Sequence, residues 1–249
     1  MHPYLLHSGH LFLPTFGLLA AAGLLAALSL SLRTARTVGL PPDRLWDAGL
    51  FALLAAFLLS RLLLIVTNLH SFLTYPILLL TVPSLTEFGL LLTAIATLVY
   101  LHFKQLPLRP TLDAWAPCAT LAWAFLALGH FAEGSDPGLP TTLPWALRIP
   151  PDTLRLHPIA LYAMLLALAL TALLHRHLCI RRQQGETAAL ALALTGVTQF
   201  LLTFLRQPNL YPDSLGNLLD PIQWAALGMI ALGALLYLLP RKAITDHAL

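Results

Sequence analysis

The chain has 249 residues, of which 58% are hydrophobic and only 10% are charged. A soluble domain carries roughly 25% charged residues, so this composition excludes an ordinary soluble protein and predicts one polytopic membrane domain over residues 1–249. The net charge of +3 comes from basic residues in short clusters between apolar runs, which argues against nucleic-acid binding. The two cysteines, Cys118 and Cys179, indicate neither a disulfide framework nor a metal site.

The sequence predicts an all-α fold of about seven transmembrane helices, because seven apolar stretches approach the roughly 20 residues that a span needs. These stretches cover residues 11–32, 48–68, 86–103, 112–133, 158–175, 187–205 and 219–239. An eighth stretch, 72–85, is shorter and contains two prolines, so a re-entrant or interfacial segment is expected there. The first ten residues contain no Lys or Arg, which favours a span over a cleavable signal at 11–32.

The basic residues predict the orientation of the helices, since short cytoplasmic loops are enriched in Lys and Arg. Ten of the 14 cations follow the first, third, fifth and seventh predicted spans: Arg33, Arg36, Arg44, Lys104, Arg109, Arg176, Arg181, Arg182, Arg241 and Lys242. This asymmetry predicts an N-terminus outside the cytoplasm and a C-terminus inside it. The long Pro- and Gly-rich loop at 134–156 is then expected on the outer side.

Several polar residues fall within or beside the predicted spans, where an ionisable group costs on the order of 3 kcal/mol and often marks a site. They are Arg61, Glu87, His130, Glu133, His157, Gln199, Arg206, Asp220 and Gln223. Six of them lie toward the outer ends of their spans: Glu87, His130, Glu133, His157, Arg206 and Asp220. Their shared depth predicts one outward-opening polar pocket.

Each of these residues also has a structural interpretation. Arg61 and Arg206 can extend to lipid headgroups, and His157 before Pro158 can cap a helix. Asp220 before Pro221 is a natural N-cap, which is the interpretation favoured here. Glu133 can be the solvated end of its helix. The sequence contains no nucleophile elbow, P-loop or zinc-protease motif, so neither a metal nor a cofactor is expected.

Several motifs resemble those of prolipoprotein diacylglyceryl transferases. Residues 157–162, His-Pro-Ile-Ala-Leu-Tyr, are similar to the family pattern H-P-x-x-L-Y-E. Residues 126–135 align without a gap with G-R-x-G-N-F-x-N-G-E, and the Leu-Pro-Trp at 143–145 follows as in the family. Residues 195–208 are similar to Y-G-x-x-R-F-x-x-E-F-x-R-x-P. Arg61, Gln223 and the Phe-Gly at 16–17 fit further family positions, so the resemblance covers nearly the whole chain.

The chain departs from this family pattern at its charged positions. Where the family carries arginines, the sequence has Ala127 and Gln199, and where it carries glutamates, the sequence has Ser135 and Thr203. Two family asparagines are replaced by His130 and Glu133, and Glu87 corresponds to the family's essential histidine. The scaffold of the motifs is therefore retained while the principal charged residues have changed.

The resemblance implies transfer of diacylglyceryl from phosphatidylglycerol to the lipobox cysteine of a preprolipoprotein, in the bacterial inner membrane. The partners would be phosphatidylglycerol or another phospholipid and a preprolipoprotein. The candidate catalytic residues are Glu87, His130, Glu133 and Arg206, and the candidate lipid-binding residues are Arg61, His157, Tyr162, Gln199 and Gln223. Glu87, or His130 with Glu133, would supply the base.

Three hypotheses remain open at the level of sequence. The chain is a divergent transferase, a catalytically inactive paralogue that binds lipid or lipoprotein, or a membrane subunit or transporter that reuses the scaffold. Loss of the paired arginines favours the second, and the new His130 and Glu133 favour the first with altered chemistry. We expect the chain to rescue the loss of an authentic prolipoprotein diacylglyceryl transferase poorly or not at all.

Overall fold

The computed structural model describes residues 4–8, 11–75, 86–148, 154–207 and 219–239. The elements are β1 (Tyr4–Ser8), β2 (Leu11–Pro14), α1 (Thr15–Val38), α2 (Pro42–Thr67), α3 (Leu69–Thr74), α4 (Glu87–Phe103), α5 (Leu108–Glu133), β3 (Leu147–Arg148), β4 (Arg155–Leu156), α6 (Ile159–Ile180), α7 (Glu186–Thr203) and α8 (Pro221–Leu238). The helices carry the fold, and the strands form two small antiparallel pairs, β1 with β2 and β3 with β4.

Six helices in the described ranges are long and apolar enough to cross a membrane, namely α1, α2, α5, α6, α7 and α8. The helix at the third predicted span, α4, has 17 residues and rises about 25 Å, so a total of seven spans stays a prediction. The first predicted span, 11–32, is divided between strand β2 and helix α1. Of the predicted segment 72–85, the first residues belong to the short helix α3, and residues 76–85 lie outside the described part.

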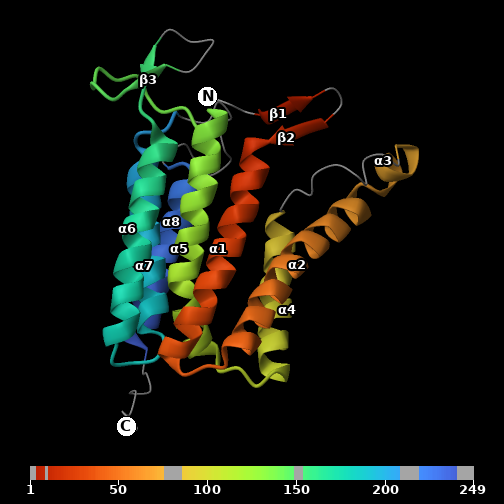
Figure 1. Cartoon of the computed structure of the whole chain (residues 1–249), viewed down its shortest axis with the longest axis vertical. Coiled ribbons are helices and arrows are strands. Elements are labelled where there is room, and N and C mark those ends of the chain that lie inside the picture. The colour runs from red at the N-terminus through yellow and green to blue at the C-terminus, as the bar shows by residue number, and fades with distance from the viewer. Residues whose placement is uncertain (1–3, 9–10, 76–85, 149–153, 208–218, 240–249) are drawn as a thin grey trace.

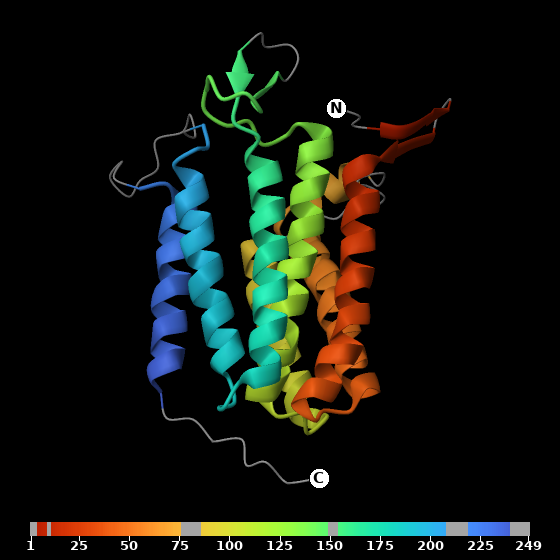
Figure 2. The ribbon, with the colours of Figure 1, turned by 60° about the vertical axis from the view of Figure 1, so that its left-hand side comes forward.

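The helices alternate in direction and form two groups joined by α1 (Figure 1). In the larger group, α5 packs against α1, α6 and α7, and α8 packs against α7 (Figure 2). In the smaller group, α4 packs along α2, and α2 contacts α1. We call the end of the protein where α5 finishes and α6 begins the loop end, and the opposite end the basic end.

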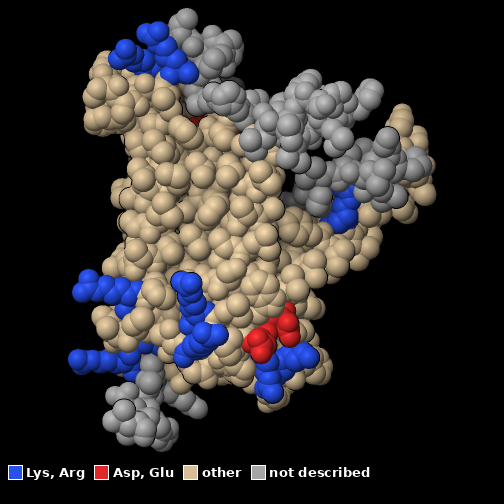
Figure 3. Space-filling model, viewed as in Figure 1, with Lys and Arg blue, Asp and Glu red and all other residues tan. Residues whose placement is uncertain are grey.

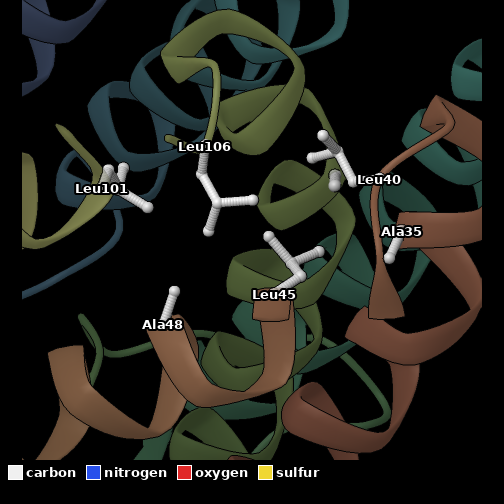
Figure 4. Packing of buried hydrophobic residues seen from close by; sticks show 7 residues of the cluster. Ala35, Leu40, Leu45, Ala48, Leu101 and Leu106 are labelled. Carbon is white, nitrogen blue, oxygen red and sulfur yellow. The ribbon is translucent and has the colours of Figure 1, made fainter. Parts of the chain in front are cut away.

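The basic end gathers eight of the ten cations that predict the cytoplasmic side, and the other two lie outside the described residues. Figure 3 shows the basic side chains at this end, below a broad surface without charged side chains. A hydrophobic core closes the same end, where Leu45 of α2 points toward Leu106 and Leu40 (Figure 4). This core ties α1, α2, α4 and α5 together, while the side that faces the cytoplasm stays a prediction.

A buried aspartate fixes the start of α7 at the basic end. Asp113 of α5 is fully buried, and its carboxylate accepts hydrogen bonds from the backbone N–H groups of Gly185 and Ala188 at 2.7 and 2.9 Å. Its Oδ2 also lies 3.5 Å from Nε of Arg181. Burial lowers the pKa of Arg181, and Asp113 and then Glu186 oppose this shift. One carboxylate of α5 therefore caps a different helix and neutralises a buried arginine.

The loop end is organised by the segment that follows α5. Gly134 ends α5 in the left-handed conformation, with φ of 74°, and its N–H bonds back to the His130 carbonyl. A residue with a side chain adopts this conformation at a cost, so glycine suits the turn. The chain then lies between α6 and α7, because Leu139 N–H bonds to the Leu205 carbonyl and His157 N–H to the Leu139 carbonyl. This path brings residues 135–138 beside the end of α7.

Candidate functional site

A cavity of about 390 Å³ opens between α5, α6, α7 and α8 near the loop end. We call it the polar cavity. Its walls are Trp123, Leu126, Ala127, His130, Asp136, Ala160, Ala163, Gln199, Arg206, Ile222, Ala225, Ala226 and Met229. Three predicted site residues therefore line one cavity: His130 of α5, and Gln199 and Arg206, which lie more than 60 residues further along the chain.

An ion pair dominates the electrostatics of the polar cavity. Nη2 of Arg206 donates to Oδ2 of Asp136 at 2.9 Å, and the two side chains are 26% and 20% exposed. The backbones of Arg206 and Gly138 form an isolated antiparallel bridge, which holds the two loops in this register. Nε of Arg206 is buried and has no hydrogen-bond partner among the described residues. Arg206 thus points at a carboxylate in the cavity.

His130 stands on the last turn of α5 with one ring nitrogen engaged. Its Nδ1 lies 2.9 Å from Oγ of Ser135, and its ring packs against Phe16 of α1 with centroids 4.8 Å apart. These contacts orient the ring, while the residue remains exposed at the cavity. Because Nδ1 is engaged with the hydroxyl, Nε2 is the ring nitrogen for which the described residues supply no hydrogen-bond partner.

An apolar groove of about 480 Å³ adjoins the polar cavity. The two share Trp123, Gln199 and Met229, and the groove extends between α5, α7 and α8 as far as Leu112 and Ala188, near the basic end. Its remaining walls are apolar or carry a threonine: Trp115, Ala116, Ala119, Thr120, Ala191, Leu192, Thr195 and Leu236. A polar chamber therefore leads into a long apolar one, which is the amphipathic pattern of a lipid.

The other predicted residues of the loop end take positions outside the cavity walls. Glu133 is half-buried as the last residue of α5 and does not line the cavity. Tyr162 accepts a hydrogen bond at 2.7 Å from the indole N–H of Trp145, and Nδ1 of His157 lies 3.4 Å from the same hydroxyl. No side-chain hydrogen bond caps α6, so His157 does not fill the capping role considered for it. His157 and Tyr162 instead hold the 134–156 loop against α6.

The start of α8 is a capping box. The carboxylate of Asp220 accepts from Ile222 N–H at 2.9 Å, and Oε1 of Gln223 accepts from Asp220 N–H at 3.0 Å. The structure thus confirms the capping role expected for Asp220. Gln223, a candidate for lipid binding, is buried with its amide oxygen in this cap and is not among the residues that line the cavity.

Two further candidates belong to the α2–α4 group. Arg61 of α2 lies over the ring of Phe72 in α3, with its guanidinium carbon 5.3 Å from the ring centroid. Glu87 is the first residue of α4, and its side chain lies outside the described part. Arg61 is not among the residues that line the polar cavity. The structure therefore places these candidates on a separate group of helices from His130 and Arg206.

Sequence reasoning missed the two aspartates that pair with arginines. Asp136 sits in a loop already rich in polar residues, so nothing in the local pattern distinguishes it from a solvated side chain. Asp113 falls near the start of an apolar stretch and beside basic residues, where an interfacial position is the ordinary expectation. The signal to look for is pairing across the chain, because Arg181 and Arg206 flank α7 and each pairs with one of these aspartates.

The described residues contain no group of three His, Cys, Asp or Glu side chains suited to a metal ion. Ala127 and Gln199, which replace two arginines of the family pattern, both lie on the cavity wall. The replaced residues and the retained Arg206 thus belong to one site.

Comparison with known proteins identifies the scaffold. A sequence model of the prolipoprotein diacylglyceryl transferase family matches residues 3–239. The chain belongs to this family. The family and the apolar helices agree on a membrane protein with transmembrane helices, in a family of transferases of lipoprotein biosynthesis.

Three bacterial relatives, each named phosphatidylglycerol–prolipoprotein diacylglyceryl transferase, illustrate the similarity. The Bordetella parapertussis protein is 35% identical over 153 residues, which is 60% of this chain and 58% of the relative. The Polynucleobacter asymbioticus protein is 35% identical over 133 residues, or 53% and 50%. The Synechococcus elongatus protein is 30% identical over 183 residues, or 69% and 63%. The alignments therefore span between a half and two thirds of the relatives' length.

Proposed function

We propose that this family member binds a glycerophospholipid and acts as a divergent diacylglyceryl transferase in lipoprotein biogenesis. The phospholipid headgroup would occupy the polar cavity, and its acyl chains would follow the apolar groove. The observation that carries this proposal is the continuity of the two spaces through Trp123, Gln199 and Met229. A polar, water-soluble ligand would leave the apolar groove empty. The acyl chains of a lipid would fill it, and burying their apolar surface would favour binding.

The proposed location is the outer half of the bacterial inner membrane, with the loop end outside the cytoplasm. The eight described cations at the basic end support this orientation through the positive-inside tendency. The donor would be phosphatidylglycerol, which the names of the relatives include, or another phospholipid, and the acceptor would be a preprolipoprotein.

The orientation has a direct test in intact cells. A cysteine introduced at Ser135, which is exposed at the loop end, should react with a membrane-impermeant maleimide from outside, and one at Gln184 in the α6–α7 turn should not. The native Cys118 and Cys179 are replaced by serine beforehand. Labelling of Gln184→Cys in intact cells would place the polar cavity on the wrong side and reject the outward site.

The reaction proposed at this site forms a thioether. The acceptor thiolate attacks the glyceryl carbon, the carbon–oxygen bond to the phosphate breaks, and the phosphate leaves with the electron pair. Nε2 of His130 would accept the thiol proton, since Nδ1 is engaged with Ser135. Arg206 would stabilise the charge on the departing phosphate. Glu133 remains an alternative base, although it does not line the cavity. Glu87, whose side chain lies outside the described part, is a second alternative.

A second candidate function is a lipid- or lipoprotein-binding subunit without catalysis. The observation that favours it is the commitment of Arg206 to Asp136, in a cavity whose walls have Ala127 and Gln199 where the family pattern has arginines. Removing one preorganised donor to a developing anion typically costs about 3 kcal/mol, or roughly a hundredfold in rate. The chain is therefore expected to be a weak transferase toward the lipobox substrate.

Detection of a thioether on a lipobox peptide, in a strain depleted of its own transferase, separates the two functions, because only a transferase forms this product. We expect little or no rescue by the wild-type chain, and we expect any thioether formed on a lipobox peptide to be lost in His130→Ala. The control is His70→Ala, which alters an exposed histidine of α3 that does not line the cavity. Full rescue that persists in the His130→Ala, Glu133→Ala double variant would reject the proposed reaction at this cavity.

A further inference from the structure

The charges in the polar cavity bear on which headgroup it accepts. Among the described residues that line it, only His130, Asp136 and Arg206 can ionise. Apart from His130, these are one carboxylate and one guanidinium, so the charges of this pair balance. Such a pair attracts a ligand that places a positive group beside the carboxylate and a negative group beside the guanidinium.

The position of Asp136 works against an anionic ligand. A phosphate that binds Arg206 must come close to the Asp136 carboxylate, because that carboxylate lies 2.9 Å from the same guanidinium. Two negative groups would then share one cation, which lowers affinity through like-charge repulsion. Asp136 is also held in place, since the Gly138–Arg206 backbone bridge fixes its loop against the end of α7.

A headgroup that carries its own cation removes this conflict. An ammonium group linked to the phosphate through two carbons can donate to Asp136 while the phosphate accepts from Arg206. Both side chains are partly exposed in the cavity, so both can be reached without dismantling the loop. An ammonium offers three donors to a carboxylate, whereas a guanidinium in a fixed pair still has further N–H groups for the phosphate.

We infer that the polar cavity selects a zwitterionic phospholipid with a primary ammonium group, the chemistry of phosphatidylethanolamine, over the anionic phosphatidylglycerol. This inference rests on the proposed phospholipid site. In a transfer reaction the departing group would then be phosphoethanolamine, released by the same bond changes as described above, with the thiol proton again passing to His130.

The test uses the full-length protein, delipidated in detergent and titrated with defined phospholipids under native mass spectrometry. Phosphatidylethanolamine should bind about tenfold more tightly than phosphatidylglycerol of the same acyl composition. Phosphatidylcholine, whose ammonium has no N–H, should bind more weakly than phosphatidylethanolamine. Arg206→Gln should weaken the binding of all three lipids, because each contains the phosphate.

The decisive variant is Asp136→Asn, which removes the carboxylate and keeps the shape of the side chain. It should abolish or reverse the preference, so that phosphatidylglycerol binds at least as well as phosphatidylethanolamine. Asp136→Glu should retain the wild-type order of affinities, which controls for disturbance of the loop. Asp43→Asn makes the same change of charge at an exposed position of α2 and should leave the order unchanged.

Two outcomes contradict different steps of the argument. If phosphatidylglycerol binds more tightly to the wild type, and Asp136→Asn does not alter that order, the inferred selectivity is wrong while the lipid site stands. If lipid binding is unaffected both by Arg206→Gln and by Ala163→Trp, which fills the cavity, the phospholipid site itself is wrong.

Discussion

An aspartate–arginine pair stands at each end of the protein, and the two pairs differ in what surrounds them. Asp113 at the basic end is fully buried, and two backbone N–H groups and Arg181 saturate its carboxylate. Asp136 at the loop end makes one hydrogen bond to Arg206, and both side chains remain partly exposed in a cavity. The buried pair thus fixes the helices at the basic end, while the partly exposed pair at the loop end remains accessible to a ligand.

The largest effect that separates the two pairs should come from Asp113→Ala. The change leaves the buried Arg181 without its counter-ion and the start of α7 without its cap, so we expect a loss of about 3–5 kcal/mol of unfolding free energy. Reversible unfolding in mixed detergent micelles measures it.

The matched control is Asp47→Ala, an exposed acid of α2, which should change stability little. Adding Arg181→Met to Asp113→Ala should recover part of the loss, because it removes the unpaired charge. An Asp113→Ala protein as stable as the wild type would show that the basic-end pair does not lock the helices.

The next largest effect should come from Gly196→Ala, which tests whether the loop-end cavity depends on close packing of α7 and α8. A Cβ at Gly196 would lie 2.7 Å from the carbonyl oxygen of Ala226, a cavity residue, so α8 must shift. We expect a loss of about 1–3 kcal/mol together with weaker lipid binding.

Gly228→Ala provides the control. Gly228 lies on α8, as Ala226 does, but a Cβ added there would lie in open space, with no other described side chain or element within 4 Å. It should be neutral or slightly stabilising, since alanine favours a helix. Equal behaviour of the two variants in thermal unfolding would argue against tight α7–α8 contact near the cavity.

Tyr162→Phe should have a smaller effect, about 1 kcal/mol, through loss of the hydrogen bond from Trp145 that holds the loop against α6. In a variant that keeps Trp145 as its single tryptophan, quenching of the indole fluorescence by an aqueous quencher should increase at the same time. Tyr100→Phe is the control, because its ring stacks on Phe51 between α4 and α2 near the basic end, away from this loop. Unchanged quenching in Tyr162→Phe would mean that the loop is fixed by other contacts.

The smallest effect on stability should be that of Asp136→Asn, at most about 1 kcal/mol, because the pair it breaks is partly exposed. Measured in the same detergent unfolding assay, it should therefore contrast with Asp113→Ala. A loss as large as that of Asp113→Ala would show that the loop-end pair is also structural, and would remove the reason to regard it as open to a ligand.

The sequence predicts most of the membrane helices because their apolar runs have the length that a bilayer demands. Polar groups at membrane depth are unusual, and this criterion selects His130, Gln199 and Arg206, which line the polar cavity. The β1–β2 hairpin escapes prediction because β2 is as apolar as the helix that follows it. Asp136 and Asp113 were not predicted as paired residues, because their arginine partners lie about 70 residues away in the chain and local composition does not reveal such pairs.

The packing of α1 against α5 has a consequence for the order of assembly in the membrane. Ser31 and Thr34 of α1 are almost fully buried, and Thr34 meets Cys118 of α5 with its hydroxyl 3.8 Å from the sulfur. The ribosome adds about 5–20 residues per second, and α2, α3 and α4 are synthesised before α5. The nascent α1 therefore waits on the order of ten seconds for α5. During this time its buried hydroxyls have to donate to carbonyls of α1 itself, as the Ser31 hydroxyl does to the Leu28 carbonyl.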